Sequence, residues 1–497
     1  MNGLPQPGLA ALVLLPLAGC GLCWVLRAPK RILAVTWLAS LLSALAAAPA
    51  VWACLHGRAL QEAQGWLALD ALSAFHLAVM YGVFILSSAY AQIYFDGGIS
   101  SGELSLAQVR QFASLWLGSL AALTLTLVSN NLGMMWVGME ATTLLTAFLI
   151  IVRRSPDALE AMWKYLLICS VGIAFAFIGT LLVAASAKGL VQDPGQLLHW
   201  SRLMAAASGL NPKLLKAGFL FVLVGYGTKA GLAPMHSWLP DAHSQAPAPV
   251  SAVFSGCMLN AGLYCILRYG ALCHALPQLA DWSAGLLRLL GLLSISVAAV
   301  FILFQNDGKR LLAYSSVEHL GIIALGMGLG TPGIFAALFH TLNHALGKSV
   351  GFFCMGRLGQ IYGTNDLRRL AGAARREPVW GNGLLLSLLA ILGAAPFAVF
   401  LSEFLVLKAA VEAHRAVVVA VFLAGTCIIF ISASRRVIAA AWGEPAAPAR
   451  LPGPRAGLAA TLLVALPLAL LLCLGVWMPG PFRGALERCA AVLNGGR

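Results

Sequence analysis

The chain has 497 residues, of which 60% are hydrophobic and only 10% charged, and its mean hydropathy is +0.86. Soluble proteins carry about 25% charged residues, so this composition excludes an ordinary soluble enzyme and predicts a membrane protein. The formal net charge of +14 does not indicate a nucleic-acid partner, because Lys and Arg fall mainly between apolar runs, where they set membrane topology.

A helix that crosses a membrane needs about 20 mainly apolar residues. The sequence contains fourteen such runs, and the first lacks the basic start of a signal peptide, so we expect it to be retained. We therefore predict an all-α polytopic membrane protein with transmembrane helices at residues 4–26, 32–54, 69–95, 111–129, 131–152, 159–187, 213–234, 250–271, 286–304, 311–330, 332–356, 382–412, 416–440 and 457–478.

The basic residues between these runs predict the orientation of the chain. Seventeen Lys and Arg residues follow odd-numbered spans, and eleven lie on the other side together with the two termini. Because cytoplasmic connections are enriched in Lys and Arg, we expect both termini on the extracytoplasmic face. The remaining four basic residues lie within spans, where a charge is a functional hypothesis by default: Lys164, Lys229, Lys348 and Lys408.

The seventh and twelfth spans contain Gly and Pro, at 225–234 and 393–403. Both residue types interrupt a helix, and the carbonyls that they free are tolerated in a membrane only at a protein-lined cavity. We predict broken helices 7 and 12. Their separation by five spans favours two inverted five-helix repeats, typical of ion pathways: residues 111–271 (helices 4–8) and 286–440 (helices 9–13), between an N-terminal three-helix segment, 1–110, and helix 14 with a short tail, 441–497.

Glu140 and Lys229 lie deep within their spans. A carboxylate at the centre of a membrane helix costs about 2.5–3.5 kcal/mol, so we expect it to be paired, protonated or hydrated. An acid and an amine that are buried singly favour an ion pair between helices, and a buried amine can act as a proton carrier. A static pair that fixes the packing of the helices is the alternative.

The eleventh span carries His340, His344 and Lys348, which share one helical face at spacings of four residues. Three titratable groups on one face favour a hydrated proton relay. The two histidines alone could bind a metal, but no Asp, Glu or Cys lies on that turn, so we expect no metal. The eleven cysteines form no metal-binding pattern either, and the one C-x-x-C pair lies inside the first apolar run.

Other polar residues are candidates for the same pathway. Glu318 and His319 lie at intermediate depth in the tenth span, and Glu403 follows the second predicted break. Lys164 could take part in the relay or could extend to the membrane edge, and the same applies to Lys408. Asn260 cannot carry charge but can hold water.

The segment Gly225 to Ser251, which includes His236, resembles the antiporter-like subunits of respiratory complex I, Mrp sodium/proton antiporters and group 4 membrane-bound [NiFe] hydrogenases. Gly138-Met139-Glu140, Lys164-Tyr165-Leu166 and the run from Lys309 to Ser316 support it. The branch that it resembles most is hydrogenase-4 component F, on the basis of Ser316 to His319, Gly356 to Arg368 and Phe400 to Phe404.

This resemblance implies residue roles. Glu140 and Lys229 would form a charge pair, Lys164 would tune Lys229, and His319, His340, His344 and Lys348 would continue a central polar axis toward Glu403. Asn260 lies where some relatives have a titratable residue, so water would be needed there. We expect no long lateral C-terminal helix of the kind found in the largest complex I relative.

The sequence contains no nucleotide, haem or cluster motif, so we expect no cofactor in this chain and an external energy source. The resemblance implies a proton-translocating subunit in a bacterial inner membrane, with other membrane subunits and a peripheral redox module that carries iron–sulfur clusters and NiFe or flavin. The alternatives are an Mrp-type sodium/proton antiporter subunit and a membrane scaffold that anchors a soluble enzyme module, for which the basic segment Arg368 to Arg376 would be the docking surface.

Overall fold

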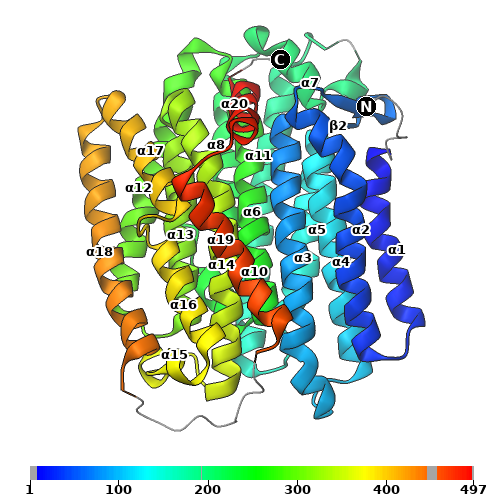
Figure 1. Ribbon diagram of the computed structural model, residues 1–497. Coiled ribbons are helices and arrows are strands. Elements are labelled where there is room, and N and C mark those ends of the chain that lie inside the picture. Colours follow the sequence, from blue (N-terminus) through cyan, green and yellow to red (C-terminus); the bar gives the residue numbers. More distant parts are fainter. Residues whose placement is uncertain (1–7, 192, 445–455, 495–497) are drawn as a thin grey trace.

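The computed structural model describes residues 8–191, 193–444 and 456–494, and most of them are helical (Figure 1). The predicted span 4–26 and the predicted segment 441–497 extend into residues outside this part of the chain. The α-helices are α1 (Leu9–Val25), α2 (Pro29–Leu55), α3 (Ala71–Ser100), α4 (Leu106–Val128), α5 (Leu132–Ile150), α6 (Pro156–Ser186), α7 (Trp200–Ala205), α8 (Pro212–Ala230), α9 (Trp238–Gln245), α10 (Ala248–Val253), α11 (Leu259–His274), α12 (Pro277–Phe304), α13 (Gly308–Met327), α14 (Gly330–Tyr362), α15 (Ala373–Arg376), α16 (Pro378–Ile391), α17 (Ala398–Glu412), α18 (Ala416–Trp442), α19 (Leu458–Val476) and α20 (Gly480–Leu493).

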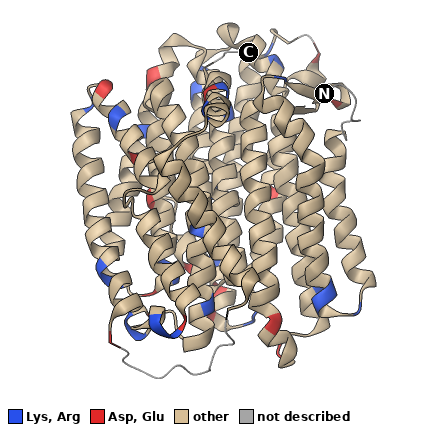
Figure 2. Ribbon diagram, in the orientation of Figure 1, with Lys and Arg blue, Asp and Glu red and all other residues tan. Residues whose placement is uncertain are grey.

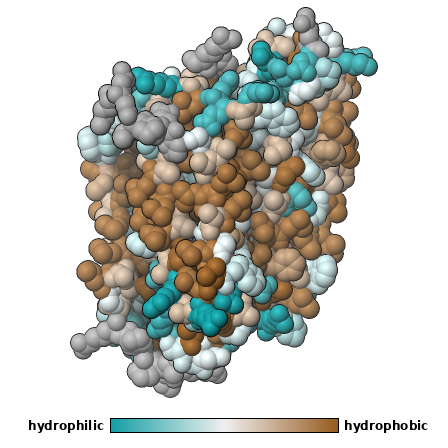
Figure 3. Space-filling view, turned by 90° about the vertical axis from the view of Figure 1, so that its right-hand side faces the viewer, coloured by the Kyte–Doolittle hydropathy of each residue, from teal (hydrophilic) through white to brown (hydrophobic). Residues whose placement is uncertain are grey.

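Each of the fourteen predicted runs overlaps at least one of these helices. Nine helices of the described residues are long and apolar enough to cross a membrane, and α1 and α16 are apolar but shorter. The predicted runs that do not meet this standard include those of α8, α13 and α14, which carry buried Lys, Glu and His. Charged residues gather at the two ends of the bundle (Figure 2), and a hydrophobic belt lies between more polar ends (Figure 3). The protein is an integral membrane protein.

One short part of the described chain forms β-structure, which the sequence did not predict. Residues Leu60–Glu62 (β1) and Leu67–Leu69 (β2) form an antiparallel hairpin between α2 and α3. Strands of three residues are too short for a period of two to be visible in the sequence. The hairpin lies at the same end of the bundle as both ends of the described chain, which we call the terminus-side end (Figure 1).

The most buried helices lie at the centre of the bundle. All of the apolar window of α10–α11 is buried, compared with 33% of that of α18. Between α10 and α11, residues Phe254–Met258 form a π-helical turn, which the sequence did not predict. Such turns place one extra residue in the helix and occur frequently at functional sites.

Both predicted helix breaks are present. α8 ends at Ala230 before Gly231, and α16 ends at Ile391 shortly before Gly393. Both glycines have left-handed backbone angles, with φ of 71° and 74°, which glycine adopts without the steric cost of a side chain. Each glycine begins a Gly-X-Ala-Pro tetrad with a cis Ala–Pro bond, after which the chain continues to α9 and α17.

Candidate functional site

Lys229 lies at the end of α8, at the first helix break, and is fully buried. Its Nζ atom donates hydrogen bonds to the hydroxyl of Thr143 at 2.9 Å and to the hydroxyl of Tyr165 at 2.6 Å. Tyr165 also contacts Thr146, hydroxyl to hydroxyl, at 2.6 Å, and Thr146 donates to the carbonyl of Thr142 at 2.6 Å. Because an ammonium group only donates, the hydroxyl of Tyr165 accepts a hydrogen bond from Lys229 and donates one to the hydroxyl of Thr146.

Glu140 lies half-buried on α5, near Lys229 but not in direct contact with it. One carboxylate oxygen accepts a hydrogen bond from Ser170 at 3.1 Å, and the other is buried without a partner. No ion pair joins Glu140 to Lys229 in the described part of the chain, so the expected direct charge pair is replaced by hydroxyl contacts. A carboxylate with a free buried oxygen has room for a further donor, such as water or the amine.

The π-helical turn lies between this group and the histidines of α14. On one side, the hydroxyl of Tyr165 lies 3.4 Å from the sulfur of Met258. On the other, the hydroxyl of Ser255 lies 3.3 Å from Nε2 of His344 and 2.8 Å from the hydroxyl of Ser316. The turn thus contacts both halves of the polar interior.

Three histidines meet at the interface of α13, α14 and α17. Nδ1 of His319 lies 2.8 Å from Nε2 of His340, whose Nδ1 lies 2.9 Å from the hydroxyl of Ser402. The rings of His319 and His344 are 5.3 Å apart between centroids. All three histidines are fully buried. The chain of ring nitrogens and hydroxyls therefore runs without interruption from His319 to α17, a geometry suited to proton transfer.

Lys348 follows His340 and His344 along α14, toward the C-terminal end of this helix. Its Nζ atom donates to the carbonyl of Leu312 at 2.8 Å, and the hydroxyl of Ser316 contacts the same carbonyl at 3.0 Å. Glu318, on the same helix as Ser316, is 3% exposed and has one carboxylate oxygen without a partner. His340, His344 and Lys348 are fully buried on α14, and Glu318 is buried on the adjoining α13. Their role in a proton relay stays a prediction.

Glu403 lies next to the second break and close to two of the histidines. Single ligand atoms of His319, His340 and Glu403 all lie within 4.8 Å of one another, which raises the question of a metal site. Two nitrogens bound to one tetrahedral zinc ion would be about 3.3 Å apart, given bonds of about 2.0 Å. The observed 2.8 Å separation of the histidine nitrogens is that of a hydrogen bond and fits proton exchange better.

Three predicted residues lie away from this interior. The side chain of Lys164 is 46% exposed and pairs with Glu160 at 2.6 Å and with Asp241 at 3.1 Å. Lys408 is 58% exposed and pairs with Glu412 at 3.7 Å, which agrees with the alternative that it extends to the membrane edge. His236, in the first break, contacts Phe301 and Tyr314 by its ring, whereas Asn260 is buried on α11.

Sequence reasoning missed the hydroxyl residues that link the charged groups. Tyr165, Ser255 and Ser402 are fully buried and touch Lys229, His344 and His340, respectively. Tyr165 directly follows Lys164 in one of the motifs that carry the family resemblance, but only Lys164 was predicted to be a site residue. A hydroxyl in an apolar helix can bond to its own backbone, so only the packing of the helices shows which ones face the polar interior.

The chain is similar in sequence and in fold to known membrane proteins. Residues 129–429 match the family described as "NADH:quinone oxidoreductase/Mrp antiporter, TM". A hydrogenase-4 component F homolog of Methylacidiphilum infernorum (isolate V4) is 39% identical over 379 residues, 76% of this chain and 79% of that protein. A chain of respiratory complex I from Thermus thermophilus with bound aureothin is 27% identical with a TM-score of 0.75, and the match covers 94% of this chain and 96% of the other.

A similar fold occurs in a chain of the membrane-bound sulfane sulfur reductase, an archaeal respiratory membrane complex. Its TM-score is 0.84 at 24% identity, and the match covers 98% of this chain and 97% of that chain. The matched residues 129–429 contain the two helix breaks, Lys229, the π-helical turn and the three histidines. The chain belongs to the NADH:quinone oxidoreductase/Mrp antiporter transmembrane family.

Proposed function

We propose that this chain is a proton-translocating subunit of a redox-driven membrane complex of the hydrogenase or complex I type. The observation that carries the proposal is an array of titratable residues that are all fully buried: Lys229, His319, His340, His344 and Lys348. Titratable groups are expensive in a membrane and are retained there for transport. Membership of the family and the relatives reported above support the same function.

Proton movement would use titratable groups that the hydroxyl contacts hold in place. The hydroxyls of Thr143 and Tyr165 hold the ammonium of Lys229, and its proton passes to water at the first helix break. In the second half, a proton moves from Nδ1 of His319 to Nε2 of His340, while Nδ1 of His340 donates to the hydroxyl of Ser402. Asn260 does not titrate, so water completes the path between the halves.

The internal organisation belongs to the same proposal. We assign fourteen crossings and two inverted repeats, residues 111–271 and 286–440, flanked by 1–110 and 441–497. The support is the shared Gly-X-Ala-Pro tetrad at Gly231 and Gly393. The membrane would be a bacterial inner membrane, with both termini on the extracytoplasmic face.

The chain would work beside other membrane subunits and a peripheral redox module. Iron–sulfur clusters and NiFe or flavin would belong to those partners, and this chain would hold no cofactor. A sodium/proton antiporter subunit is the second candidate, because carbonyls freed at broken helices can coordinate sodium ions. Sodium-dependent proton movement by the reconstituted chain without a redox partner would favour that alternative.

The test is proton pumping by the assembled complex in proteoliposomes. Lys229→Met and Lys348→Met should each abolish pumping while the complex still assembles, because each removes a titratable group without adding bulk. Lys408→Met is the matched control, since Lys408 is 58% exposed and away from the axis, and it should pump normally. Normal pumping by both of the first two variants would overturn the proposal.

A further inference from the structure

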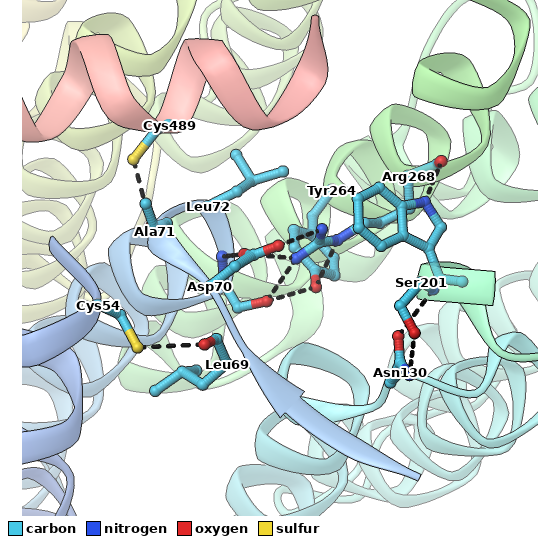
Figure 4. Close-up of polar contacts among 12 residues, drawn as sticks. Cys54, Leu69, Asp70, Ala71, Leu72, Asn130, Ser201, Tyr264, Arg268 and Cys489 are labelled. Carbon is cyan, nitrogen blue, oxygen red and sulfur yellow. Dashed lines mark hydrogen bonds and ion pairs between the residues drawn. The ribbon is translucent and has the colours of Figure 1, made fainter. Parts of the chain in front are cut away.

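A cavity of about 450 Å³ lies toward the terminus-side end of the bundle, between the β-hairpin, α5, α7 and α11. Apolar residues line most of it, and its polar lining includes Asp70, Asn130, Ser201 and Arg268. Asn130 and Ser201 are hydrogen-bonded to each other at 2.9 Å (Figure 4). The lining contains both apolar and polar groups. Which ligand the cavity can hold depends on whether the charge of Arg268 is available to it.

Arg268 is buried, and four of its five N–H donors have hydrogen-bond partners. The guanidinium forms two hydrogen bonds to Asp70, at 2.6 and 2.7 Å, one to Ser73 at 2.6 Å and one to Tyr264 at 3.0 Å (Figure 4). The ring of Trp200 lies 4.5 Å from it. A positive charge that is neutralised by a carboxylate held in two hydrogen bonds is not available to an anion in the cavity. Water is the ligand that suits the remaining hydroxyl and amide groups.

The hydroxyls of Ser73 and Tyr264 lead inward from this ion pair. They lie 2.8 Å apart, and Tyr264 also donates to the carbonyl of Leu127 at 3.2 Å. Leu127 itself lines a second, smaller void of about 10 Å³. Ser73 and His76 are three residues apart on α3, and Asn260 and Tyr264 are four apart on α11, so the void lies about one helical turn further in.

The small void has the size and the polar partners of a single water site. A water needs about 10–15 Å³ and two to four polar partners. The void is lined by His76, Asn260 and Thr341, among apolar residues. Asn260 is 4% exposed, and its side-chain oxygen has no hydrogen-bond partner. A buried amide oxygen left in this state requires an explanation, and an ordered water supplies one.

His76 adds a base to this void. Its Nδ1 atom lies 2.9 Å from the carbonyl of Leu72, and because a carbonyl only accepts, Nδ1 carries the hydrogen. In the neutral ring Nε2 is then the bare nitrogen that can take up a proton. The charged groups nearest along the route are Asp70 and Arg268, which neutralise each other.

The void also reaches the central axis. Thr341 lies on α14 between His340 and His344, and Gly256, another lining residue, directly follows Ser255. Ser255 is the residue whose hydroxyl contacts Nε2 of His344. The other ring nitrogen of His344, Nδ1, is buried without a partner.

We propose that the cavity and the void are parts of one water-filled branch through which protons pass between the aqueous phase at the terminus-side end and His344. This inference rests on the proposed function. A proton that arrives on water is bound at Nε2 of His76, whose Nδ1 proton stays on Leu72, and the same Nε2 proton is released to the water held by Asn260. The first step breaks an O–H bond of hydronium and forms the N–H bond at Nε2, and the second step breaks this N–H bond and forms an O–H bond on the water held by Asn260. Half of the route lies on α3, outside the matched family region.

The test compares variants of this branch with variants of the axis in the same proteoliposome assay. Asn260→Leu fills the void and His76→Gln removes its base, so both should lower pumping to the level of Lys348→Met with the complex assembled. Ser296→Ala, in an exposed position on α12, is the control. If Lys348→Met abolishes pumping while both branch variants pump normally, the branch is wrong and the proposed function stands. If none of them lowers pumping, both are wrong.

A second measurement does not depend on how well Asn260→Leu folds. The thiol of Cys257 lines the void, and soft thiol ligands bind silver ions. Silver ions added on the terminus side should inhibit proton flux in the wild-type complex and not in Cys257→Ser. Equal inhibition of the two proteins, or inhibition of neither, would overturn the branch.

Discussion

Tyr165→Phe tests whether the hydroxyl of Tyr165 is needed to stabilise the ammonium of Lys229. The change removes one hydroxyl, which accepts a hydrogen bond from Lys229 at 2.6 Å and contacts Thr146 at 2.6 Å. A hydrogen bond to a charged group contributes about 1.5–3 kcal/mol. The ammonium form of Lys229 should therefore lose stability by that amount, a factor of about 10–150 in its population relative to the neutral form.

Proton pumping should fall while assembly and electron transfer by the complex are retained. The assay is acidification measured with a pH-sensitive dye in proteoliposomes, with redox turnover recorded in parallel. Tyr269→Phe is the matched control, because Tyr269 is also fully buried and forms a hydroxyl contact of 2.6 Å, to Thr180, away from the axis. Equal pumping by Tyr165→Phe and Tyr269→Phe would refute the role of the Tyr165 hydroxyl.

Three further changes test packing and placement. Gly225→Ala places a Cβ atom 2.5 Å from backbone atoms of α6, so it should lower the yield of folded protein and reduce the free energy of unfolding by about 1–3 kcal/mol. Gly82→Ala is the control, because its Cβ atom would have nothing within 4 Å, and it should change neither. Arg268→Met should destabilise the protein by about 3–5 kcal/mol in a detergent melt, because it leaves Asp70 unpaired, and adding Asp70→Leu should recover much of the loss. Lys164→Gln should reduce pumping far less than Lys229→Met, since Lys164 is 46% exposed; an equal loss would contradict that placement.

The features that could be predicted from the sequence are those that the apolar membrane environment imposes on the chain. An apolar run must form a helix to satisfy its backbone, so the spans were predictable. Gly231 and Gly393 begin tetrads that interrupt two of them, and both breaks are present. The depth of Lys229 followed from its distance along α8, and the shared face of His340 and His344 from helical periodicity.

Contacts between helices were not predictable in the same way. Glu140 and Lys229 were expected to pair because each lacks a partner in its own helix, but Thr143 and Tyr165 take the amine instead. The π-helical turn adds one residue to a helix, and no periodicity in a single sequence reveals it. Lys408 shows the converse: the sequence places it within a span, yet packing leaves it on the surface.

Glu140 differs from the rest of the axis in where it faces. Lys229 is fully buried, whereas Glu140 is half-buried and lies on α5 between Val137 and Leu144, which are 43% and 47% exposed. Residues three and four positions away lie on the same helical face, so Glu140 borders the lateral surface of the bundle. A neighbouring subunit packed on this face could change the charge near Glu140 without reaching Lys229. Because Glu140 has a free carboxylate oxygen, such a change would alter its attraction for the amine. Under the proposed function, this is the route by which a redox reaction in a partner subunit would act on Lys229.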